Sequence, residues 1–361
     1  MAIGVACSSK EKSIMSTSDI CNVSASKSNN DVCEVNNKLQ NMSTDDTDVL
    51  PVCANCGKEG ISDNMNTCNK CKVVKYCNAV CKKVHKKKHK KECEEHIRLA
   101  TEKHDEELRI AAKLHDEKLF KQPPPLDDCP ICFLLLPNLD PTGKKYYTCC
   151  GKVICSGCVH APVYDNQGNK VDDKKCPFYR TPPPKSNEDN IERHKKRVDV
   201  GDAIAIYNQG VFYRDGIRGY PQDHSKALEL WHRAGEVGSI DAYLNIGYAY
   251  QQGRGVEVDE KKAKHYFELA AMKGCMYSRH NLGLQEEKSG NMDRALKHYM
   301  ITVRSGVSQS LENVKTFYSN GHATKEDYTK ALQLYQTYLG EIKSDQRDKA
   351  ATYDSEAYRY Y

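Results

Sequence analysis

The chain has 361 residues, with 54 basic and 49 acidic side chains and a formal net charge of only +5. This balance gives no overall field to attract nucleic acid, and no apolar run approaches the roughly 18 residues of a membrane span. The 18 cysteines fall mostly in close pairs, and polar sequence rather than a leader follows the short apolar start. We therefore expect a cytoplasmic or nuclear protein, bound to neither membrane nor nucleic acid, whose cysteine pairs hold metal rather than form disulfides.

Residues 1–50 are rich in serine, asparagine, aspartate and threonine and have almost no aromatic or periodic apolar positions. Such a segment buries too little surface to offset its ordering entropy, so we expect a disordered tail. Its three cysteines have no close partners and are expected to be free thiols.

The segment 51–93 has the spacing of a double metal site. A C-x2-C turn directs two thiolates to one point, and C-x3-C or H-x3-C pairs do so on one face of a helix. Eight such ligands predict two tetrahedral zinc ions with no open position, which is typical of structural sites. By spacing alone, His85 competes with His89, and the pairs could combine sequentially or interleaved. The eight candidate ligands are Cys53, Cys56, Cys68, Cys71, Cys77, Cys81, His89 and Cys93.

With Tyr76 just before Cys77 and "HKKEC" at its end, this segment resembles the MYND zinc finger family. The resemblance implies an interleaved arrangement, with Cys53, Cys56, Cys77 and Cys81 on one ion and Cys68, Cys71, His89 and Cys93 on the other. It also implies a protein-interaction module, since several members of the family bind proline-rich peptides. The "PPPL" at 123–126 is then either an internal ligand or a plain helix stop, and the lysines of 82–91 form a solvated helix face or, alternatively, serve a nuclear regulator.

Residues 94–121 are highly charged, and their pattern predicts a spacer helix. The prolines of "QPPPL" at 122–126 end it, because proline lacks an amide donor and restricts the residue before it.

A second cysteine cluster fills residues 122–184, where "CPIC", "CCGKVICSGC" and "CPFYR" resemble a RING finger. The resemblance assigns Cys129, Cys132, Cys155 and Cys158 to a first complete zinc site. Cys149, Cys150 and Cys176 fill three positions of the second site; alternatively, Cys150 is its third ligand and Lys152 takes the histidine position.

The eighth RING position holds Tyr179, whose phenol, with a pKa near 10, seldom ionises to bind zinc. The second site is then impaired, empty, or completed by His160 or water. We therefore predict three zinc ions per chain rather than four.

RING ubiquitin ligases form no covalent intermediate; they position a charged ubiquitin-conjugating enzyme for reaction. The resemblance places Ile131 and Pro177 on the surface that docks this enzyme, and Arg180 where it would bridge enzyme and ubiquitin. In the alternative interpretation, Ile131 and Pro177 only pack the module and Arg180 is solvated. No residue of the chain is assigned as catalytic.

Residues 200–346 contain four similar stretches, "YNQGVFY…KALELWHRA", "LNIGYAY…KAKHYFELA", "HNLGLQE…RALKHYMIT" and "ENVKTFY…KALQLYQTY". Each predicts a helix, a loop and a second helix, and the third has the shortest loop. They resemble Sel-one-like repeats, relatives of tetratricopeptide repeats, which implies a curved solenoid whose hollow face receives a protein or peptide. Residues 347–361 are a tail or cap. The matching positions are Asn208, Asn245, Asn281 and Asn313; Ala227, Ala263, Ala295 and Ala331; and Trp231, Phe267, Tyr299 and Tyr335.

Together these observations predict a mainly α fold: a helical-repeat solenoid plus two small zinc-stabilised α+β modules and a disordered N-terminal tail. The expected function is a zinc-binding, multi-module scaffold or adaptor for proteins or peptides, which include a proline-rich ligand or a ubiquitin-conjugating enzyme. The alternative is a RING-type ubiquitin ligase whose repeats recruit substrate, and a weaker alternative is a nuclear regulator acting through the MYND finger.

Overall fold

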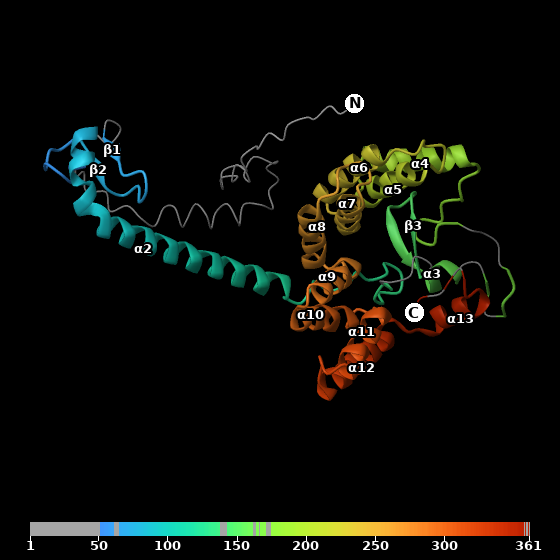
Figure 1. The fold of residues 1–361 in the computed structure, drawn as a ribbon. Coiled ribbons are helices and arrows are strands. Elements are labelled where there is room, and N and C mark those ends of the chain that lie inside the picture. Colours follow the sequence, from blue (N-terminus) through green and yellow to red (C-terminus); the bar gives the residue numbers. More distant parts are fainter. Residues whose placement is uncertain are drawn as a thin grey trace, which may run out of the picture. The chain divides into compact units, whose positions relative to one another are not determined.

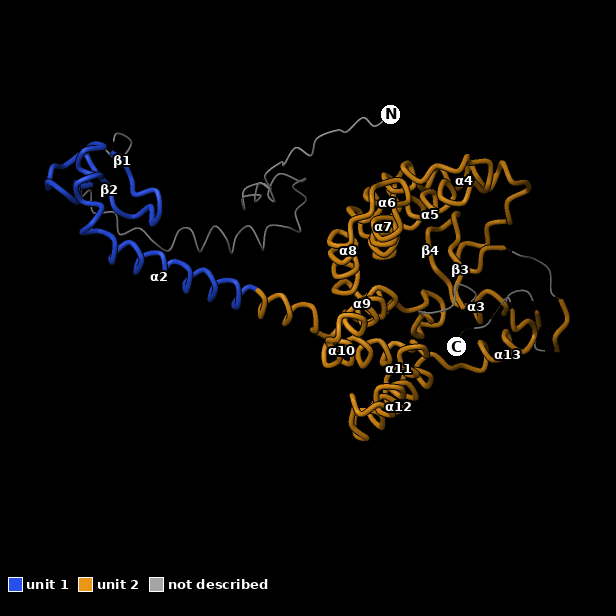
Figure 2. The backbone as a smooth tube through the Cα atoms, in the orientation of Figure 1, with its two compact units in different colours: residues 1–111 blue, residues 112–361 orange. Residues whose placement is uncertain are grey.

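The computed structural model describes residues 51–60, 65–137, 143–161, 164–165, 167–170, 175–356, 358 and 360. The tail expected at 1–50 lies outside these ranges. The chain divides into two compact units, Met1–Ala111 and Ala112–Tyr361 (Figure 2). The described elements are mainly helical, as predicted. No described helix has an apolar stretch long enough to cross a bilayer.

The first unit contains a short antiparallel pair, β1 (Asn66–Thr67) and β2 (Lys75–Tyr76), followed by α2 (Ala79–Leu119). The Asn78 side chain caps α2 by accepting a hydrogen bond from the Cys81 amide at 2.9 Å. The expected ligand helix and spacer helix are therefore one helix of 41 residues. It runs unbroken because no glycine or proline interrupts it before "QPPPL".

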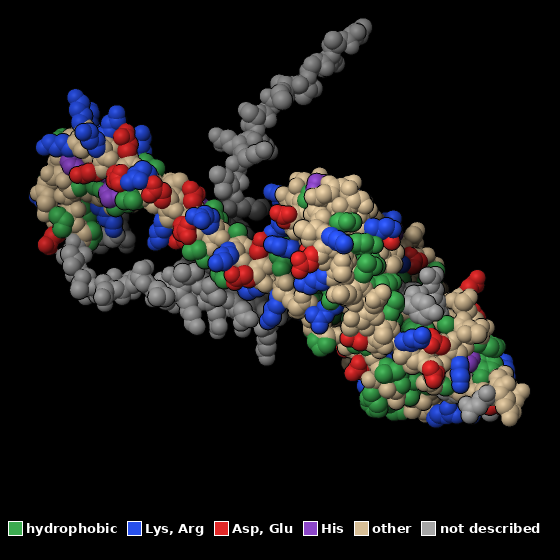
Figure 3. Space-filling view, turned by 90° about the horizontal axis from the view of Figure 1, so that it is seen from below, with side chains coloured by type: hydrophobic (Ala, Val, Ile, Leu, Met, Phe, Trp, Pro, Cys, Tyr) green, Lys and Arg blue, Asp and Glu red, His purple; other side chains and the backbone are tan. Residues whose placement is uncertain are grey.

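Opposite charges are interspersed along the middle of α2. Arg98 pairs with Glu95 at 2.5 Å and with Glu102 at 2.7 Å, and all three side chains are more than half exposed. Basic and acidic side chains are likewise mixed over the face of the molecule seen in Figure 3. Exposed pairs of this kind add only a few tenths of a kcal/mol each to helix stability, about 0.3–0.5 for i,i+4 pairs.

The second unit begins with the cysteine-rich residues 122–184, which we call the second cysteine module. It contains an antiparallel hairpin, β3 (Lys144–Tyr147) and β4 (Lys152–Cys155), and the short helix α3 (Ser156–His160). Its buried centre consists of Ile154, Leu136 and three cysteines. A core this small needs additional cross-links to hold its shape.

The remaining helices form a series of antiparallel hairpins (Figure 1). α4 precedes four helix pairs, α5/α6, α7/α8, α9/α10 and α11/α12, and α13 follows them. The link within the third pair (289–291) is shorter than that within the second (253–259), as the sequence predicted. The bounds are Asn187–Asp199, Ala203–Asp215, His224–Glu236, Ile240–Gln252, Glu260–Met272, Met276–Lys288, Met292–Val303, Ser308–Ser319, Lys325–Ile342 and Asp345–Tyr353 for α4 to α13 in order.

In each of the first three pairs, a glycine of the first helix faces an aromatic ring of the second helix. A Cβ at Gly210, Gly247 or Gly283 would lie 2.5 Å from an atom of Trp231, Phe267 or Tyr299, respectively. These rings are 4%, 0% and 0% exposed, as expected for side chains that pack the joint between two helices. The fourth pair has Lys315 in place of the glycine, and its ring, Tyr335, is only half-buried.

The second cysteine module lies within the curve that α4 to α13 describe (Figure 1). At one end, Tyr146 of β3 packs against the core of α5–α7, and the β3–β4 turn at Gly151 abuts the Arg197 side chain. At the other end, Arg347 of α13 is fully buried and donates to the backbone carbonyls of Ile342 at 2.6 Å and Leu134 at 3.4 Å. The module and the helices therefore form one packed unit.

Candidate metal centres

The first group of predicted ligands, Cys53, Cys56, Cys77 and Cys81, is brought together by the fold. All four sulfurs lie within 4.8 Å of one another, with 3.6 Å between Cys56 and Cys77 and 3.5 Å between Cys77 and Cys81. A tetrahedral zinc ion with bonds of about 2.3 Å places its sulfur ligands about 3.8 Å apart. This group therefore fits one zinc ion, in the interleaved arrangement.

The second group consists of Cys68, Cys71, His89 and Cys93, again within 4.8 Å. The Cys71 sulfur lies 3.4 Å from His89 Nε2, and the sulfurs of Cys68 and Cys93 lie 3.7 Å apart. His85 instead places its Nδ1 3.3 Å from the Tyr76 hydroxyl. The geometry thus favours His89 over His85 as the nitrogen ligand.

In the second cysteine module, Cys129, Cys132, Cys155 and Cys158 form a third group of four. The sulfurs of Cys132 and Cys155 are 3.7 Å apart, and three of the four residues are buried. Each group of four leaves no coordination position for water or substrate, which is the arrangement of a structural zinc site.

The fourth group has three members, Cys149, Cys150 and Cys176. Although neighbouring side chains usually diverge, both adjacent cysteines belong to it, and the Cys150 and Cys176 sulfurs are 3.7 Å apart. His160, considered above as a fourth ligand, stacks its ring on Tyr164 at 4.7 Å between centroids. Lys152 is exposed at the start of β4.

The turn at Cys176 has the backbone of a zinc-binding C-x2-C turn. In four such turns, the amide of the fifth residue donates to the carbonyl of the first, and the fifth residue has a positive φ. The first and fifth residues, with N–O distances and φ, are Cys53 and Gly57 (2.9 Å, 73°), Cys68 and Lys72 (3.0 Å, 57°), Cys129 and Phe133 (2.9 Å, 56°), and Cys176 and Arg180 (2.7 Å, 56°).

Tyr179 therefore occupies the place that the second cysteine takes in the other three turns. Its side chain is 62% exposed and packs on Phe178, with ring centroids 5.0 Å apart. Its amide lies 3.4 Å from the Cys176 sulfur. Burial alone would raise the pKa of Cys176, but hydrogen bonds from the Tyr179 and Phe178 amides and from Cys149 outweigh it and lower that pKa. The turn stabilises a thiolate at Cys176 even though the second sulfur is missing.

The three residues assigned to a conjugating enzyme lie on the turns of this module. Ile131 is 36% exposed, Pro177 is half-buried and Arg180 is exposed. Phe133, which the sequence did not single out, is 77% exposed on the first of these turns. It follows a C-x2-C pair directly, where glycine would be the unstrained residue for a positive φ.

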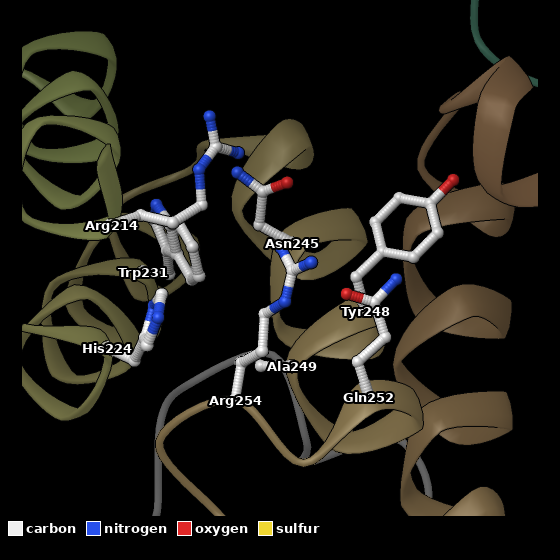
Figure 4. Close-up of a pocket in the computed structure, with 8 residues that line it drawn as sticks. All are labelled: Arg214, His224, Trp231, Asn245, Tyr248, Ala249, Gln252 and Arg254. Carbon is white, nitrogen blue, oxygen red and sulfur yellow. The ribbon is translucent and has the colours of Figure 1, made fainter.

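The repeats contain a small pocket of about 150 Å³ that sequence reasoning missed. The guanidinium groups of Arg214 and Arg254 and the amide of Asn245 face a common space beside Tyr248 (Figure 4). Arg214 is already bound by the Asp215 carboxylate, with two contacts of 2.7 Å, whereas Arg254 has no ion pair among the residues described. No local pattern marks the two arginines, because they come from different repeats.

Comparison with known proteins identifies two kinds of module in this chain. A MYND finger matches residues 53–93, and the Sel1 repeat matches residues 203–239, 240–275 and 316–337. The chain thus carries a MYND finger and Sel1 repeats, both as predicted. The helix pair α9/α10 lies between matched repeats and has the same hairpin form.

Similarity to individual proteins is confined to part of the chain. The "ERAD-associated E3 ubiquitin-protein ligase component HRD3B" of Arabidopsis thaliana is 31% identical over 103 residues, 28% of this chain and 16% of that protein. The putative sel1-like repeat-containing protein L21 of Acanthamoeba polyphaga mimivirus is 27% identical over 62 residues, 17% of this chain and 12% of that protein. The chain therefore spans less than a fifth of either relative.

Among solved structures, a Sel1 repeat protein from Oxalobacter formigenes shares 26% identity, with a TM-score of 0.38 over 43% of this chain and 64% of that one. The protective antigen c5321 of uropathogenic Escherichia coli, which displays an SLR fold, shares 23% identity, with a TM-score of 0.37 over 48% and 37% of the two chains.

Proposed function

We propose that this protein is an interaction scaffold in which zinc fixes the shape of small modules and the Sel1 repeats hold a partner protein. The main support is the closed geometry of three cysteine groups, each of which supplies four ligands and leaves no position for a reacting molecule. Sel1 repeats generally mediate protein–protein interactions. We place the protein in the cytoplasm or nucleus, where thiol ligands remain reduced.

The name of HRD3B, a ligase component, also fits an adaptor role. In this proposal the chain presents partners to other proteins and performs no chemistry of its own. The MYND finger would take a proline-rich segment of one partner, and the repeats would take another.

The repeat pocket suggests the chemistry of its partner. Arg214 and Arg254 bring two positive charges beside the Asn245 and Gln252 amides, and one acidic group, Asp215, offsets Arg214. A volume of about 150 Å³ suits one side chain or a chain terminus rather than a cofactor. The partner segment would therefore insert a carboxylate, which arginine binds in a bidentate manner.

A random peptide library displayed on phage and selected on the full chain should be enriched in peptides with Asp, Glu or a free C-terminus at one position. The double variant Arg214→Ala/Arg254→Ala should bind the selected peptides at least about tenfold more weakly, because a charged hydrogen bond contributes roughly 1.5–3 kcal/mol. Titration calorimetry measures this, with Lys261→Ala, exposed on α8, as the matched control. Peptides without acidic groups, or equal binding by the double variant, would contradict the proposed pocket.

A second candidate function, a RING-type ubiquitin ligase, is favoured by the exposed apolar side chains on the turns of the second cysteine module. Ile131, Phe133 and Tyr179 are 36%, 77% and 62% exposed, and side chains of this kind occur at protein interfaces. In this alternative, the conjugating enzyme docks on Ile131 and Pro177, and Arg180 contacts ubiquitin.

An autoubiquitination assay with a panel of conjugating enzymes separates the two functions. The scaffold proposal predicts no chain formation above the level of Cys129→Ser, which loses a ligand of a closed centre. In the ligase alternative, Tyr179→Cys would add a fourth sulfur that anchors the turn with Arg180 to the metal, so it should raise activity about tenfold, because positioning dominates this catalysis. Robust activity of the unaltered chain, lost in Cys129→Ser, would favour the ligase.

A further inference from the structure

We propose that Cys149, Cys150 and Cys176 form an open zinc site whose fourth ligand is exchangeable and enters from the adjoining cavity as a small anionic thiolate. This inference rests on the zinc-binding part of the proposed function and adds a ligand site to it. Within the described ranges, these three cysteines form a group with no fourth histidine, cysteine or carboxylate. Three protein ligands and one open position are the arrangement that admits an outside ligand.

Neither side chain considered as a fourth ligand, Tyr179 or His160, belongs to this group. Tyr179, at the place of the missing cysteine, is 62% exposed and packs on Phe178. His160 is held among the rings of Tyr164, Tyr353 and Tyr358 at 4.7–5.5 Å. Since neither completes the tetrahedron, the described residues leave the fourth position to water or a solute.

A cavity of about 470 Å³ reaches this group, and both Cys149 and Cys176 line it. It lies between the β3–β4 hairpin and the helices α4 and α5, so the fold of the second unit creates it. Thr181 contributes a further polar side chain beside Cys149. Burial raises the pKa of the Cys149 thiol, and the hydrogen bond from Thr181 partly opposes this rise. The cavity offers far more room than a water molecule needs.

The charge of the cavity selects an anion. Among the described residues, its lining contains Lys145, Arg193 and Arg218 and no acidic side chain. Asp189 already pairs with Arg193 at 2.9 Å, whereas Lys145 and Arg218 lie over the rings of Tyr147 and Phe212 at 5.5 and 5.1 Å. Three thiolates on Zn²⁺ leave a net charge of −1, and a fourth makes it −2; the cations offset this charge. His194, whose pKa is lowered first by burial and then by Arg218, adds no charge.

The binding step is a ligand exchange without oxidation. The incoming thiol loses its proton to solvent, its sulfur forms a bond to the ion, and the bound water leaves. Mercaptoacetate carries a carboxylate and 2-mercaptoethylamine carries an ammonium group, so the two probes have similar size and opposite charge. The cavity should prefer mercaptoacetate, because Lys145 and Arg218 attract the carboxylate and repel the ammonium.

Cobalt(II) reports this exchange through its visible absorption, which depends on the number and kind of ligands. The full chain, loaded with cobalt, should bind a fourth ion, one more than the missing cysteine at Tyr179 led us to predict from the sequence, and Cys176→Ser should lack it. The difference spectrum should shift and strengthen as mercaptoacetate is added. Mercaptoethylamine should need at least a tenfold higher concentration. Cys149→Ser serves as a second reference if Cys176→Ser does not fold.

Two variants test the origin of the effect. Tyr179→Cys should supply the fourth sulfur, hold a fourth zinc ion through dialysis and abolish the response to added thiol. Arg218→Ala should remove most of the preference for mercaptoacetate without changing the cobalt count, whereas Lys195→Ala, exposed on α4 outside the cavity lining, should not.

Two results would overturn the inference and leave the three closed centres intact. One is a count of three cobalt ions in both the unaltered chain and Cys176→Ser; the other is a fourth ion whose absorption does not change when either thiol is added. A count below three in the unaltered chain would instead contradict the zinc-binding scaffold itself.

Discussion

Removing zinc with a chelator is expected to unfold residues 51–93 and to leave the repeat helices α5 to α12 folded. Apart from cysteines, the buried apolar side chains among the described residues of this finger are Met65 and Tyr76, and its β-sheet has two residues per strand. Zinc binding contributes about 10–16 kcal/mol per site in comparable fingers, far more than such a core supplies. The repeats bury several aromatic and aliphatic clusters without metal and should not respond.

Amide hydrogen exchange read by mass spectrometry, with and without chelator, measures this directly. Protection in β1, β2 and the first turns of α2 should vanish, and restoring zinc should recover it. Residues 122–161 should lose protection mainly around Cys129 and Cys150, because Tyr146 and Leu135 also pack against the helices of the second unit. Unchanged protection across both cysteine modules would contradict every metal centre described above.

The groups of candidate metal ligands and the repeats were predictable because their signals are local or periodic. A pair such as Cys77 and Cys81 is four residues apart on one helix face, so its spacing alone brings the sulfurs together. The pairing between distant groups came from family resemblance, and the structure brings together the interleaved groups that the resemblance implied.

The packing of the second cysteine module against the repeats could not be predicted, because it leaves no local spacing or periodic pattern in the sequence. Arg347 donates to the carbonyl of Leu134, 213 residues earlier in the chain, and no spacing rule connects residues that far apart. The same holds for the cavity beside Cys149, since Arg218 reaches it from a loop after α5. The exposure of Tyr179 and its packing on Phe178 left no signal either, since the sequence shows only a missing cysteine at this position.

Truncating Phe267 to alanine is expected to destabilise the repeats by about 3–5 kcal/mol, the usual range for deleting a buried ring. Phe267 is fully buried, packs edge-on against Tyr248 at 5.3 Å and lies in one buried cluster with Leu119, Ala271 and Leu282. Gly247 gives the ring its space, since a Cβ there would lie 2.5 Å from it. Because neighbouring backbone cannot collapse onto the lost ring, the cavity should remain.

Tyr335→Ala in the fourth repeat is the matched control. Its ring occupies the corresponding position but is half-buried, and the position that matches the glycine of the other repeats holds Lys315, so we expect a loss of about 1 kcal/mol. Urea unfolding followed by fluorescence of the single tryptophan, Trp231, which is 4% exposed in the first repeat, reports both. With a slope of about 2–3 kcal/mol/M, Phe267→Ala should lower the midpoint by roughly 1–2.5 M.

The position of Trp231 makes the result informative about cooperation between repeats. In a solenoid each repeat is stabilised by its neighbours, so damage in the second repeat should reach the first through their shared interface. That interface includes Tyr243, Tyr250 and Tyr266, which pack against the cluster around Trp231. A normal Trp231 transition in Phe267→Ala, with exchange protection lost only in α7 and α8, would show that the repeats unfold independently. If the Trp231 transition shifts together with the loss of protection in α7 and α8, the two repeats unfold cooperatively. The second cysteine module then packs, through Tyr146, against one cooperative unit.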